Sequence, residues 1–412
     1  MTRPGNRDIA VIGAGVKAPG GPGLDGLWQR LLAGRPAISR YRHPDLPEKI
    51  SLVTAEVTGF DPGSYLTPAE QRRLPRVHLL AIGAADDALR DCPDRPSPAR
   101  CAVVCGQSYP SAAFLDEGYA KIAAHGIRGL SPLSVPMMMV NSVAAHLAMR
   151  YGFQGPCRTV ATACASGADA IGQGAELLRA GAADLVLAGG VEGVLGLWTV
   201  LSFYRTGALS QCPDPDSASR PFDRDRNGFV LGEGAGFVVL QRLADARAQD
   251  RGILGLVRGY AATCDAHHIV APREDGAVAR RCAELALADA GLTPADVGHI
   301  NAHGTSTVFN DLAEARAMAE LFGPSPPPVT AVKGVTGHPI SAAGAVEAIV
   351  ALRSLAEGVI PPTGGYRNPD PAVGLDIVHD APRPTSERTA MSNSFGFGGH
   401  NAVLILSTPS AI

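Results

Sequence analysis

The sequence predicts an α/β protein made of two similar halves, and three observations carry this prediction. Short apolar runs typical of buried strands alternate with longer stretches that have the periodicity of helices. Each half opens on an apolar strand and later contains a turn of small residues with a candidate functional group. Hydrophobic residues make up 46% of the 412 residues and charged residues only 18%, which suits a large buried core. From the alternation we expect helices packed on largely parallel sheets.

The first half is predicted to begin with a strand that leads through a glycine-rich turn into a helix. It ends on a polar stretch that we expect to be helical and to join the halves. We therefore divide the chain into an N-terminal half, 1–252, and a C-terminal half, 253–412. Strands are predicted at 8–16, 102–105, 184–188, 236–240, 254–264, 300–302 and 402–406, helices at 24–32, 168–180, 277–290, 311–321 and 343–355, and the join at 241–252.

Charge and hydropathy disfavour several classes of partner. The 36 basic and 39 acidic side chains leave a net charge of −3, which offers no net attraction to nucleic acid or to an anionic membrane. No apolar run reaches the roughly 18 residues of a membrane-spanning helix, and the start of the chain lacks the apolar core of a signal peptide. The eight cysteines form neither a CxxC pair nor a zinc-like spacing with histidine, so we expect no metal site of that kind. A cytoplasmic protein is expected.

A dinucleotide site is the first alternative function, because the strand at 8–16 contains Gly13 and Gly15 near its end. The third glycine of a GxGxxG fingerprint is missing, and Pro19 prevents a helix from starting where a pyrophosphate would bind. An NAD-dependent oxidoreductase is therefore disfavoured. NAD binding would be its signature.

Cys164 is the candidate nucleophile. It lies in the segment VATACASGA, an apolar strand that ends in small residues before a predicted helix. A cysteine at such a junction sits near a helix N-terminus, where free N–H groups and the macrodipole favour the thiolate. The small neighbours leave room for a bulky thioester. For this segment taken alone, a buried structural cysteine is the alternative.

Three further segments carry candidate functional groups. His303 begins an HGTST turn after a short apolar strand, and such a turn can place an imidazole in a cavity. Lys333 and His338 flank a second turn, and Glu347 falls on the helix that follows. The third segment, 392–401, has three glycines and two aromatic residues, so its backbone N–H groups can approach a ligand closely. Lone histidines are more often structural, so these segments count mainly in combination.

Five segments together resemble the signature blocks of β-ketoacyl-acyl-carrier-protein synthases. Their order and spacing are similar to those of the elongating class, which has a Cys-His-His set rather than the Cys-His-Asn set of the initiating class. The resemblance covers essentially the whole chain and implies the thiolase fold, in which two pseudo-equivalent α/β halves form α-β-α-β-α layers. The segments are TACASG around Cys164, PFDRDRNGFVLGEGAG at 221–236, NAHGTST around His303, KGVTGHPISAAGAVE around Lys333 and His338, and NSFGFGGHN around Phe397.

The resemblance implies a decarboxylating condensation. An acyl group passes from the phosphopantetheine thioester of an acyl carrier protein to Cys164, and the N–H groups of Cys164 and Phe397 form the oxyanion hole. His303 and His338 then stabilise the enolate that forms when malonyl-carrier-protein loses CO₂, and the carbanion attacks the acyl group to give a 3-oxoacyl product. No dissociable cofactor is expected, because the phosphopantetheine arrives on the carrier protein.

The same resemblance implies a supporting role for Lys333. It is expected to pair with Glu347, with Asp311 and Glu314 as further candidate partners, and so to hold both histidine loops in place. An ordinary structural ion pair is the alternative. Related enzymes sometimes hold a structural monovalent cation, near positions that match Asn301, Glu347, Ser392 and Asn393.

Five residues receive substrate-binding roles from the resemblance. Thr305 and Thr307 match positions that hydrogen-bond the pantetheine arm. Phe397 matches a gating aromatic residue, and Gly396 belongs to the glycines that give its loop freedom to move. Tyr109 stands at the floor of the acyl pocket, where a smaller residue is usual, so we expect a preference for short or unusually shaped acyl primers. A Tyr109 that packs at a subunit interface is the alternative.

The resemblance also implies partners. The methionines at 137–139 match a segment at the dimer interface near the partner's acyl tunnel, although plain core packing is the alternative. We expect an acyl carrier protein and a second ketosynthase-like subunit, either another copy or a chain-length factor. As a discrete chain the protein fits a type II system, and the sequence leaves fatty-acid and polyketide pathways open. Val308, where proline is usual after HGTST, touches no reacting atom.

Two related functions stay open. A chain-length factor keeps this fold but usually lacks the nucleophile, so Cys164 argues against it. A thioester-dependent acyltransferase or an amide-forming enzyme would use Cys164 without decarboxylating malonate, and would therefore release no CO₂.

Overall fold

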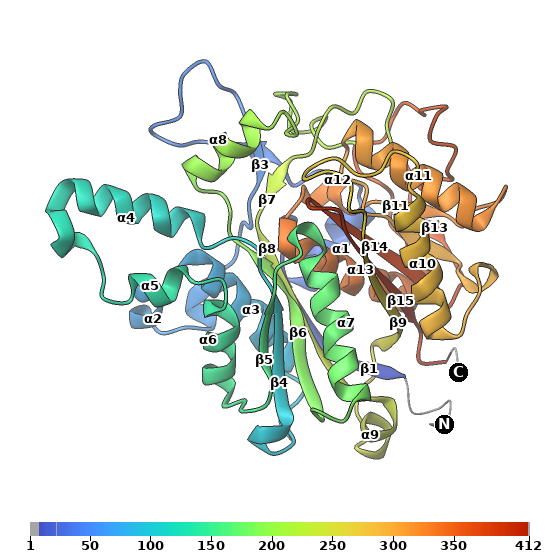
Figure 1. Ribbon diagram of the computed structural model, residues 1–412, viewed down its shortest axis with the longest axis horizontal. Helices are drawn as coiled ribbons and strands as arrows, with labels where there is room; N and C mark the ends of the chain where they lie inside the picture. The colour runs from blue at the N-terminus through green and yellow to red at the C-terminus, as the bar shows by residue number, and fades with distance from the viewer. Residues whose placement is uncertain (1–7, 22, 411–412) are drawn as a thin grey trace.

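The computed structural model describes residues 8–21 and 23–410, and a ten-stranded sheet dominates it (Figure 1). The spatial order of the strands is β11-β10-β14-β15-β9-β1-β8-β6-β4-β5. The first half of the chain contributes β1 (Ile9–Lys17), β4 (Cys101–Gly106), β5 (Cys157–Val160), β6 (Leu185–Glu192) and β8 (Gly234–Arg242). The second half contributes β9 (Gly255–Cys264), β10 (His299–Asn301), β11 (Val329–Thr330), β14 (Thr389–Gly396) and β15 (His400–Ser407).

The two sets of five strands repeat one topology. Counted outward from the centre of the sheet, each half presents its first, fifth, fourth, second and third strand in that order. The first strands of the two halves, β1 and β9, pair antiparallel at the centre, where Ile9 lies opposite Val257. The duplication predicted from the sequence is therefore present in the strand order. The boundary between residues 252 and 253 stays a prediction.

The expectation of largely parallel sheets is wrong, because each half is mixed. β4 pairs parallel with β5 and β6, as β10 does with β11 and β14. The fifth strand of each half, β8 or β15, runs antiparallel to both of its neighbours. In the second half, β14 and β15 are joined by a short hairpin turn and not by a crossover helix, and a hairpin makes its strands antiparallel. Strand–helix alternation alone does not reveal this.

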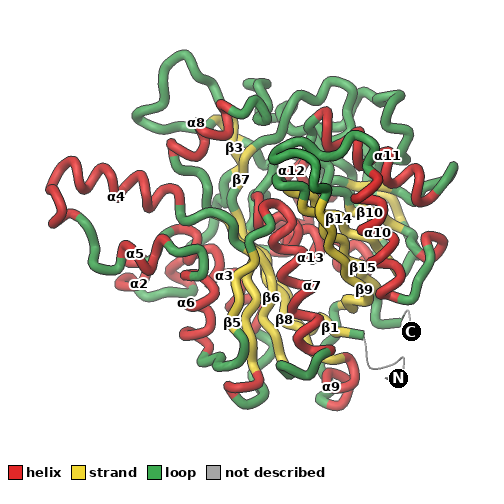
Figure 2. Tube along the Cα trace, in the orientation of Figure 1, coloured by secondary structure: helices red, strands yellow, loops and turns green. Residues whose placement is uncertain are grey.

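Helices form three layers around the two halves of the sheet, which confirms the predicted α-β-α-β-α arrangement (Figures 1 and 2). α7 (Ser166–Arg179) and α13 (Ala343–Glu357) pack on each other in the central layer, and strands of both halves contribute side chains to the same apolar cluster. A second cluster lies between the first half of the sheet and α3 (Arg76–Leu89) and α6 (Ser142–Tyr151). A third lies beneath α10 (Ala277–Ala290) and α11 (Val308–Phe322).

The strands are buried on both faces. In β4, Ala102 and Val104 face the central cluster, whereas Val103 and Cys105 face the outer one. This period-2 alternation within an unbroken apolar run is what a strand between two helix layers requires.

Gly13 and Gly15 serve this packing and not a phosphate. A Cβ added to Gly15 would lie 2.0 Å from the carbonyl oxygen of Ala84 in α3, and one added to Gly13 would lie 2.1 Å from that of Ala88. The glycines therefore let α3 lie directly on β1. α3 covers the face where a dinucleotide-binding turn would have to be open.

The remaining elements complete the outline. The join predicted at 241–252 is shorter than expected, since residues 241 and 242 belong to β8 and only the short helix α9 follows. The helix α4 projects from the body of the molecule (Figure 1). None of the described helices is long and apolar enough to cross a membrane. The other helices are α1 (Leu24–Leu32), α2 (Pro68–Arg73), α4 (Ala112–His125), α5 (Ser134–Met138), α8 (Leu197–Arg205), α9 (Leu243–Ala248) and α12 (Lys333–Thr336), and the small sheets are β2 (Ser39–Arg40) with β3 (Val53–Ala55) and β7 (Leu231–Gly232), and β12 (Val359–Ile360) with β13 (Arg383–Pro384).

Candidate active site

A cavity of about 340 Å³ collects the predicted site residues from both halves of the chain. The first half supplies the candidate nucleophile and an apolar wall, and the second half supplies the histidines and the glycine-rich loop. Of the predicted residues, those that line it are Tyr109, Cys164, His303, Thr305, Thr307, His338, Gly396 and Phe397. Lys333 and Glu347 are not among its lining residues and lie behind the histidines.

Cys164 lies in a tight turn that precedes the central helix α7. The strand β5 ends at Val160, earlier than the sequence suggested, and the 3-10 turn η5 (Ala163–Ala165) follows before α7 begins at Ser166. Ala163 has a φ of +50°, in the left-handed region. Cys164 therefore occupies a sharp turn at a helix N-terminus, as predicted.

The protonation state expected for Cys164 is wrong. The side chain is only 7% exposed, and burial raises the pKa of its thiol to about 12. The charge of Lys333 and the N–H groups of Phe397 and of Cys164 itself act in the opposite direction, but they do not outweigh the loss of water. The resting nucleophile is a thiol, because desolvation depends on the tertiary packing around the turn.

His303 is held on three sides. Its N–H donates to Glu314 Oε1 at 2.8 Å, and the next N–H, that of Gly304, donates to Glu314 Oε2 at 2.9 Å. Lys333 Nζ donates to the His303 carbonyl oxygen at 2.6 Å and lies 3.2 Å from Nδ1. An ammonium group can only donate, so Nδ1 is the acceptor and the imidazole proton lies on Nε2.

His338 completes the pair. Its ring lies edge-on to the His303 ring with centroids 5.4 Å apart, and it meets Phe229 on its other side at the same distance. Burial, followed by the charge of Lys333, lowers the pKa of both imidazoles well below 6.5, and His338 lowers that of His303 further. Both rings are therefore neutral at pH 7.

Lys333 is fully buried and pairs with Glu347, whose Oε1 lies 2.5 Å from Nζ. The sequence offered Asp311 and Glu314 as further partners, and neither forms an ion pair with Lys333. Glu314 instead binds the two N–H groups of the His303 turn. Asp311 accepts from the N–H of Phe222 at 2.7 Å, so it supports the neighbouring loop.

The loop that carries Phe397 connects β14 and β15 and lies against the nucleophile turn. A Cβ added to Gly396 would lie 3.0 Å from the Cys164 nitrogen and 2.9 Å from the carbonyl oxygen of Thr162. Only glycine allows this approach, and it brings the Phe397 N–H to the Cys164 sulfur. Two N–H groups thus converge on one point beside the thiol.

Thr305 and Thr307 lie on the other side of the cavity, with their hydroxyl oxygens 2.9 Å apart. Thr307 also caps α11 by accepting from the N–H of Asn310 at 3.3 Å. Tyr109 contributes to the apolar wall, where its ring stacks obliquely on Phe203 with centroids 5.9 Å apart. Tyr109 therefore lines the cavity, and its effect on acyl chain length stays a prediction.

Four phenylalanines that line the cavity, Phe309 among them, were not singled out from the sequence. Phe203, Phe229 and Phe395 line the wall, and each ring lies within 6 Å of another aromatic or histidine ring. Phe229 and Phe395 fall inside two of the quoted signature segments, so the sequence held a signal for them. Phe203 lies on α8, a helix that was not predicted from the sequence, so only the tertiary structure places it at the cavity.

Several buried oxygens near the predicted cation position have no hydrogen-bond partner within the described chain. They are Oδ1 of Asn301, Oδ1 of Asn393 and Oε2 of Glu347, and Ser392 accepts from the amide nitrogen of Asn301 at 3.2 Å. Uncharged and carboxylate oxygens of this kind are ligands for a hard cation. The residues present fit such a group.

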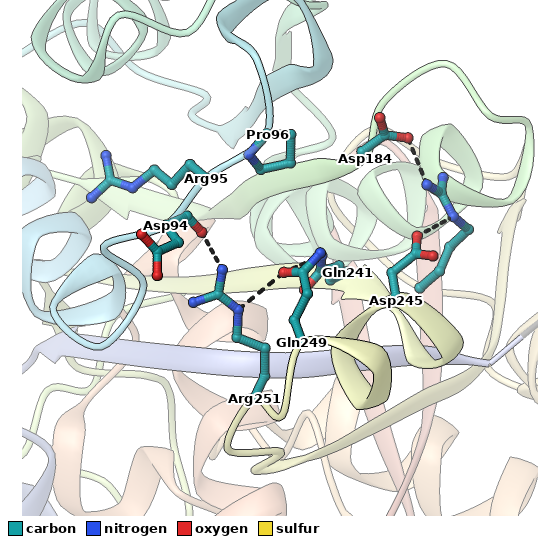
Figure 3. Close-up of a pocket in the computed structure, with 9 residues that line it drawn as sticks. Asp94, Arg95, Pro96, Asp184, Gln241, Asp245, Gln249 and Arg251 are labelled. Carbon is teal, nitrogen blue, oxygen red and sulfur yellow. Dashed lines mark hydrogen bonds and ion pairs between the residues drawn. The ribbon is translucent and has the colours of Figure 1, made fainter.

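A second cavity, of about 590 Å³, lies beside α9 and shares no lining residue with the first (Figure 3). Its charged side chains largely satisfy one another: Arg242 binds Asp184 at 2.5 Å and Asp245 at 2.7 Å. The residues that line it include no cysteine or histidine. The cavity around Cys164 is therefore the candidate active site.

Comparisons with known proteins point to one family. The model of the N-terminal domain of β-ketoacyl synthases matches residues 6–246, and the model of the C-terminal domain matches residues 254–367. The chain is 38% identical to 3-oxoacyl-[acyl-carrier-protein] synthase 2 of Rhizobium meliloti, covering 97% of this chain and 98% of that one. It is 37% identical to the protein of the same name from Synechocystis, over 96% and 97% of the two chains.

Solved structures agree with this. A chain of the ishigamide ketosynthase/chain length factor superposes with a TM-score of 0.90 at 32% identity, covering 98% of this chain and 99% of that one. A chain from a type II polyketide synthase acyl-carrier protein in complex with its ketosynthase gives 0.89 at 29% identity, with the same coverage. With two domain models over most of its length and relatives that span it from end to end, this chain belongs to the β-ketoacyl synthase family.

Proposed function

We propose that the protein condenses an acyl group held on Cys164 with malonyl-acyl-carrier-protein, releasing CO₂ and forming a 3-oxoacyl-carrier-protein. One observation supports this above the others: a buried thiol, two neutral imidazoles and two converging N–H groups share a single cavity. An acyltransferase that does not decarboxylate malonate would not need two neutral imidazole donors.

The first step is acyl transfer to the thiol. The Cys164 sulfur attacks the thioester carbonyl of the incoming acyl group, and the oxyanion that forms is stabilised by the N–H groups of Cys164 and Phe397. The carbon–sulfur bond to the pantetheine then breaks. Because Cys164 starts as a thiol, its proton leaves with the pantetheine sulfur, so the exchange of one thioester for another is balanced.

The second step is decarboxylation. The bond between the malonyl α-carbon and its carboxylate breaks, and the electron pair is delocalised onto the thioester carbonyl oxygen as an enolate. His303 Nε2–H faces this step as a neutral donor, because Lys333 occupies Nδ1, and we assign the same donor role to His338. Neutral donors suit an enolate, since a protonated imidazole would tend to give its proton away.

In the last step the carbanion attacks the acyl-Cys164 carbonyl. The carbon–sulfur bond breaks, and the cysteine sulfur leaves as a thiolate. Protonation of this thiolate regenerates the Cys164 thiol. Lys333 does not take part in bond making. Its pairing with Glu347 and with the His303 carbonyl oxygen makes it a positioning residue for His303.

The test is to measure the two half-reactions separately. Mass spectrometry of the protein after incubation with acyl-carrier-protein should show an acyl adduct on Cys164, and malonyl-carrier-protein should then yield CO₂. An acyl adduct without CO₂ release would favour the alternative acyltransferase or amide-forming function, and no adduct at all would favour a chain-length factor.

We also propose a structural monovalent cation bound by Asn301, Asn393 and Glu347, through the unpartnered oxygens described above. It would give a partner to Glu347 Oε2, the carboxylate oxygen that Lys333 does not bind. At about a hundred times its Kd such an ion adds roughly 2.7 kcal/mol of stability. Replacing choline chloride by KCl at constant ionic strength should therefore raise the Tm of the wild type and not that of Asn393→Ala. Equal Tm values in both salts would contradict it.

A second ketosynthase-fold subunit is the proposed structural partner, either another copy or a chain-length factor. β5 is the last strand of the sheet, so its outer edge has no partner within the described chain, and Cys157 and Arg158 at its start are exposed. The neighbouring segments α4 to α6 expose large apolar side chains, a pattern typical of protein interfaces. These side chains include Tyr119, Ile127, Val135, Met138, Met139 and Met149, while Met137 is buried.

Light scattering should give twice the monomer mass for the purified protein if the partner is a copy. Val135→Glu, in the exposed apolar surface, should weaken that dimer, whereas Leu285→Glu on α10 serves as a matched control of similar chemistry. A monomer that pairs only when a chain-length factor is co-expressed would identify the heterodimer. A monomer under both conditions would contradict the proposal.

The carrier protein is the proposed source of both substrates. The cavity is also lined by Val270, Val308 and Phe309, each at least 43% exposed, from a loop and the start of α11 in the second half. Such an apolar rim suits contact with a carrier protein that delivers its pantetheine arm. A cytoplasmic location and the choice between fatty-acid and polyketide pathways stay predictions.

A further inference from the structure

Three hydroxyl groups, two of them on buried residues, surround the carbonyl oxygen of Ala163, the residue before the nucleophile. Ser166 Oγ donates to that oxygen at 2.6 Å, and Ser108 Oγ and Ser341 Oγ each lie 3.3 Å from it. The hydroxyls also bond one another, since Ser341 donates to Ser108 at 2.8 Å and Ser108 lies 3.0 Å from Ser166. Ser108, Ser166 and Ser341, here called the serine cluster, therefore form a chain of hydrogen bonds that ends on Ala163.

The serine cluster lies directly behind the wall of the acyl cavity. Tyr109 and Ile340 line the cavity and are the sequence neighbours of Ser108 and Ser341, and Ala163, which also lines the cavity, accepts hydrogen bonds from the cluster. None of the three serines is among the cavity-lining residues. The cluster thus supports the wall without touching a substrate.

Two residues of this wall hold a backbone conformation that their side chains disfavour. Ala163 has a φ of +50°, and Ile340 has a φ of +42°. Left-handed backbone is uncommon for any residue with a Cβ and is an outlier for a β-branched one. Such strain persists only where surrounding contacts determine it. For Ala163 those contacts are the hydroxyls of the serine cluster.

Glu192 lies at the open end of this chain. It is the last residue of β6, is completely buried, and its carboxyl lies beside the Ser341 hydroxyl and the N–H groups of Ser108 and Tyr109. Neither carboxyl oxygen of Glu192 has a hydrogen-bond partner within the described chain. A protonated carboxyl can instead donate to the Ser341 oxygen, which needs a donor because its own proton is directed to Ser108.

Burial favours the neutral form of Glu192 and outweighs the Ser341 hydroxyl and the neighbouring N–H groups, which favour the carboxylate. Burial raises the pKa of its carboxyl to about 8. The titratable groups that its charge reaches are Cys105, Tyr109 and Cys164, and burial raises the pKa of each, so that all three are neutral at pH 7. An ionised Glu192 would also disfavour the thiolate of Cys164.

We infer that Glu192 is a positioning residue, which donates through the serine cluster to the Ala163 carbonyl and so fixes the Cys164 N–H of the oxyanion hole. The direction of the chain is Glu192 to Ser341, Ser108, Ser166 and then Ala163. This inference rests on the proposed function, because the oxyanion hole matters only if Cys164 is acylated.

The test compares acylation of Cys164 by an acyl-pantetheine in the wild type and in two neutral variants. Glu192→Gln keeps an N–H donor and should be acylated at the wild-type rate at pH 7. Glu192→Leu has no donor, and its kcat should fall about tenfold with little change in KM. This loss is smaller than the 10²–10³-fold loss expected when an oxyanion donor itself is removed. Between pH 7 and 9 the wild-type rate should fall as the carboxyl ionises, and the Gln variant should stay flat. A merely structural residue would not produce that difference in pH profile.

A double-mutant cycle gives a second measurement that does not depend on the folding of Glu192→Leu. Ser341→Ala should slow acylation. Glycine at position 163 adopts a positive φ without strain, so the turn should then depend less on the serine cluster. In an Ala163→Gly background the rate loss caused by Ser341→Ala should therefore be less than half as large. Ser354→Ala, which removes the hydroxyl of a buried serine on α13, is the matched control and should not change the rate. Equal pH profiles for wild type and Glu192→Gln, or additive effects in the cycle, would overturn the inference. A wild type that does not acylate would instead refute the proposed function.

Discussion

The two halves of the protein contain the same turn and use it for different purposes. In the first half η5 (Ala163–Ala165) leads into the central helix α7, and in the second half η7 (Ile340–Ala342) leads into the central helix α13. Each turn begins with a left-handed residue, Ala163 or Ile340. Each also contacts the fourth strand of the other half, η5 against β14 and η7 against β6.

The residues that follow show the difference. Cys164 is second in its turn and lines the cavity, whereas Ser341 is second in its own turn and is completely buried behind the wall. The strand that meets Cys164 ends in Gly396, which lets the Phe397 loop approach the nucleophile turn, and the strand that meets Ser341 ends in Glu192, whose carboxyl lies beside the Ser341 hydroxyl. One copy of the turn therefore faces substrate, and the other supports the first.

Replacing the nucleophile should have the largest effect. Cys164→Ala should abolish the acyl-enzyme, because no other thiol lines the cavity around this turn. Adding Ser341→Cys to that variant should not restore it, since the side chain at 341 faces the serine cluster. Mass spectrometry after incubation with acyl-carrier-protein measures both. An adduct on residue 341 would mean that the two turns are interchangeable.

The histidine variants should separate the two half-reactions. His303→Ala and His338→Ala should still acquire an acyl group, because the oxyanion hole is built from N–H groups of other residues. Loss of a donor to the enolate should slow CO₂ release from malonyl-carrier-protein by about 10²–10⁴-fold. Radiolabelled CO₂ provides the measurement, and release at the wild-type rate by both variants would remove the histidines from the mechanism.

Buried histidines should also make stability depend on pH in a defined direction. Burial lowers the pKa of His299, at the start of β10 in the second half, to about 4, and that of His78, on α3 in the first half, to about 3. The unfolded chain binds these protons near pH 6.5 and the folded chain does not, so stability is full above pH 6.5 and falls as the pH drops toward 4.

For His299 alone the loss should approach roughly 3 kcal/mol at the acid end. Denaturant unfolding from pH 7 to pH 4.5 should show a steeper decline for the wild type than for His299→Phe, which cannot be protonated. His379→Phe, an exposed histidine, is the matched control and should retain the wild-type slope. Identical slopes for all three proteins would contradict the assignment.

The smallest expected effect concerns Tyr109, on the loop after β4. The equivalent loop after β10 carries His303, so we expect the first half to serve the acyl chain here and the second half the chemistry. Tyr109→Gly should open the space beside Phe203 and speed acylation by acyl groups several carbons longer. In the wild type the phenol ring occupies this space, and the closely packed wall cannot move aside for a longer chain. Acylation rates across chain lengths measure this. An unchanged profile, or a uniform loss at every length, would make Tyr109 structural.

Much of the site could be predicted from the sequence, because its residues lie in short segments with local signals. A cysteine before a helix, a histidine in an HGTST turn and a glycine-rich loop each have a chemical meaning that does not depend on distant residues. The structure places Cys164, His303 and His338 in one cavity, as expected from the resemblance. Phe203 had no such signal, since its helix was not predicted and its role depends on the packing of α8.

The sequence by itself determined five of the longer helices, α1, α7, α10, α11 and α13, and most strands of the ten-stranded sheet, because periodicity and end signals act over a few residues. α10 begins and ends at the residues predicted, and Gly291 closes it in a left-handed conformation. Only the tertiary structure decided the direction of the strands, the thiol state of Cys164 and the side to which Ser341 points. Strand direction depends on which connections are hairpins, and the state of a thiol depends on how much water its neighbours remove. Both are set by residues far apart in the chain, which no local pattern records.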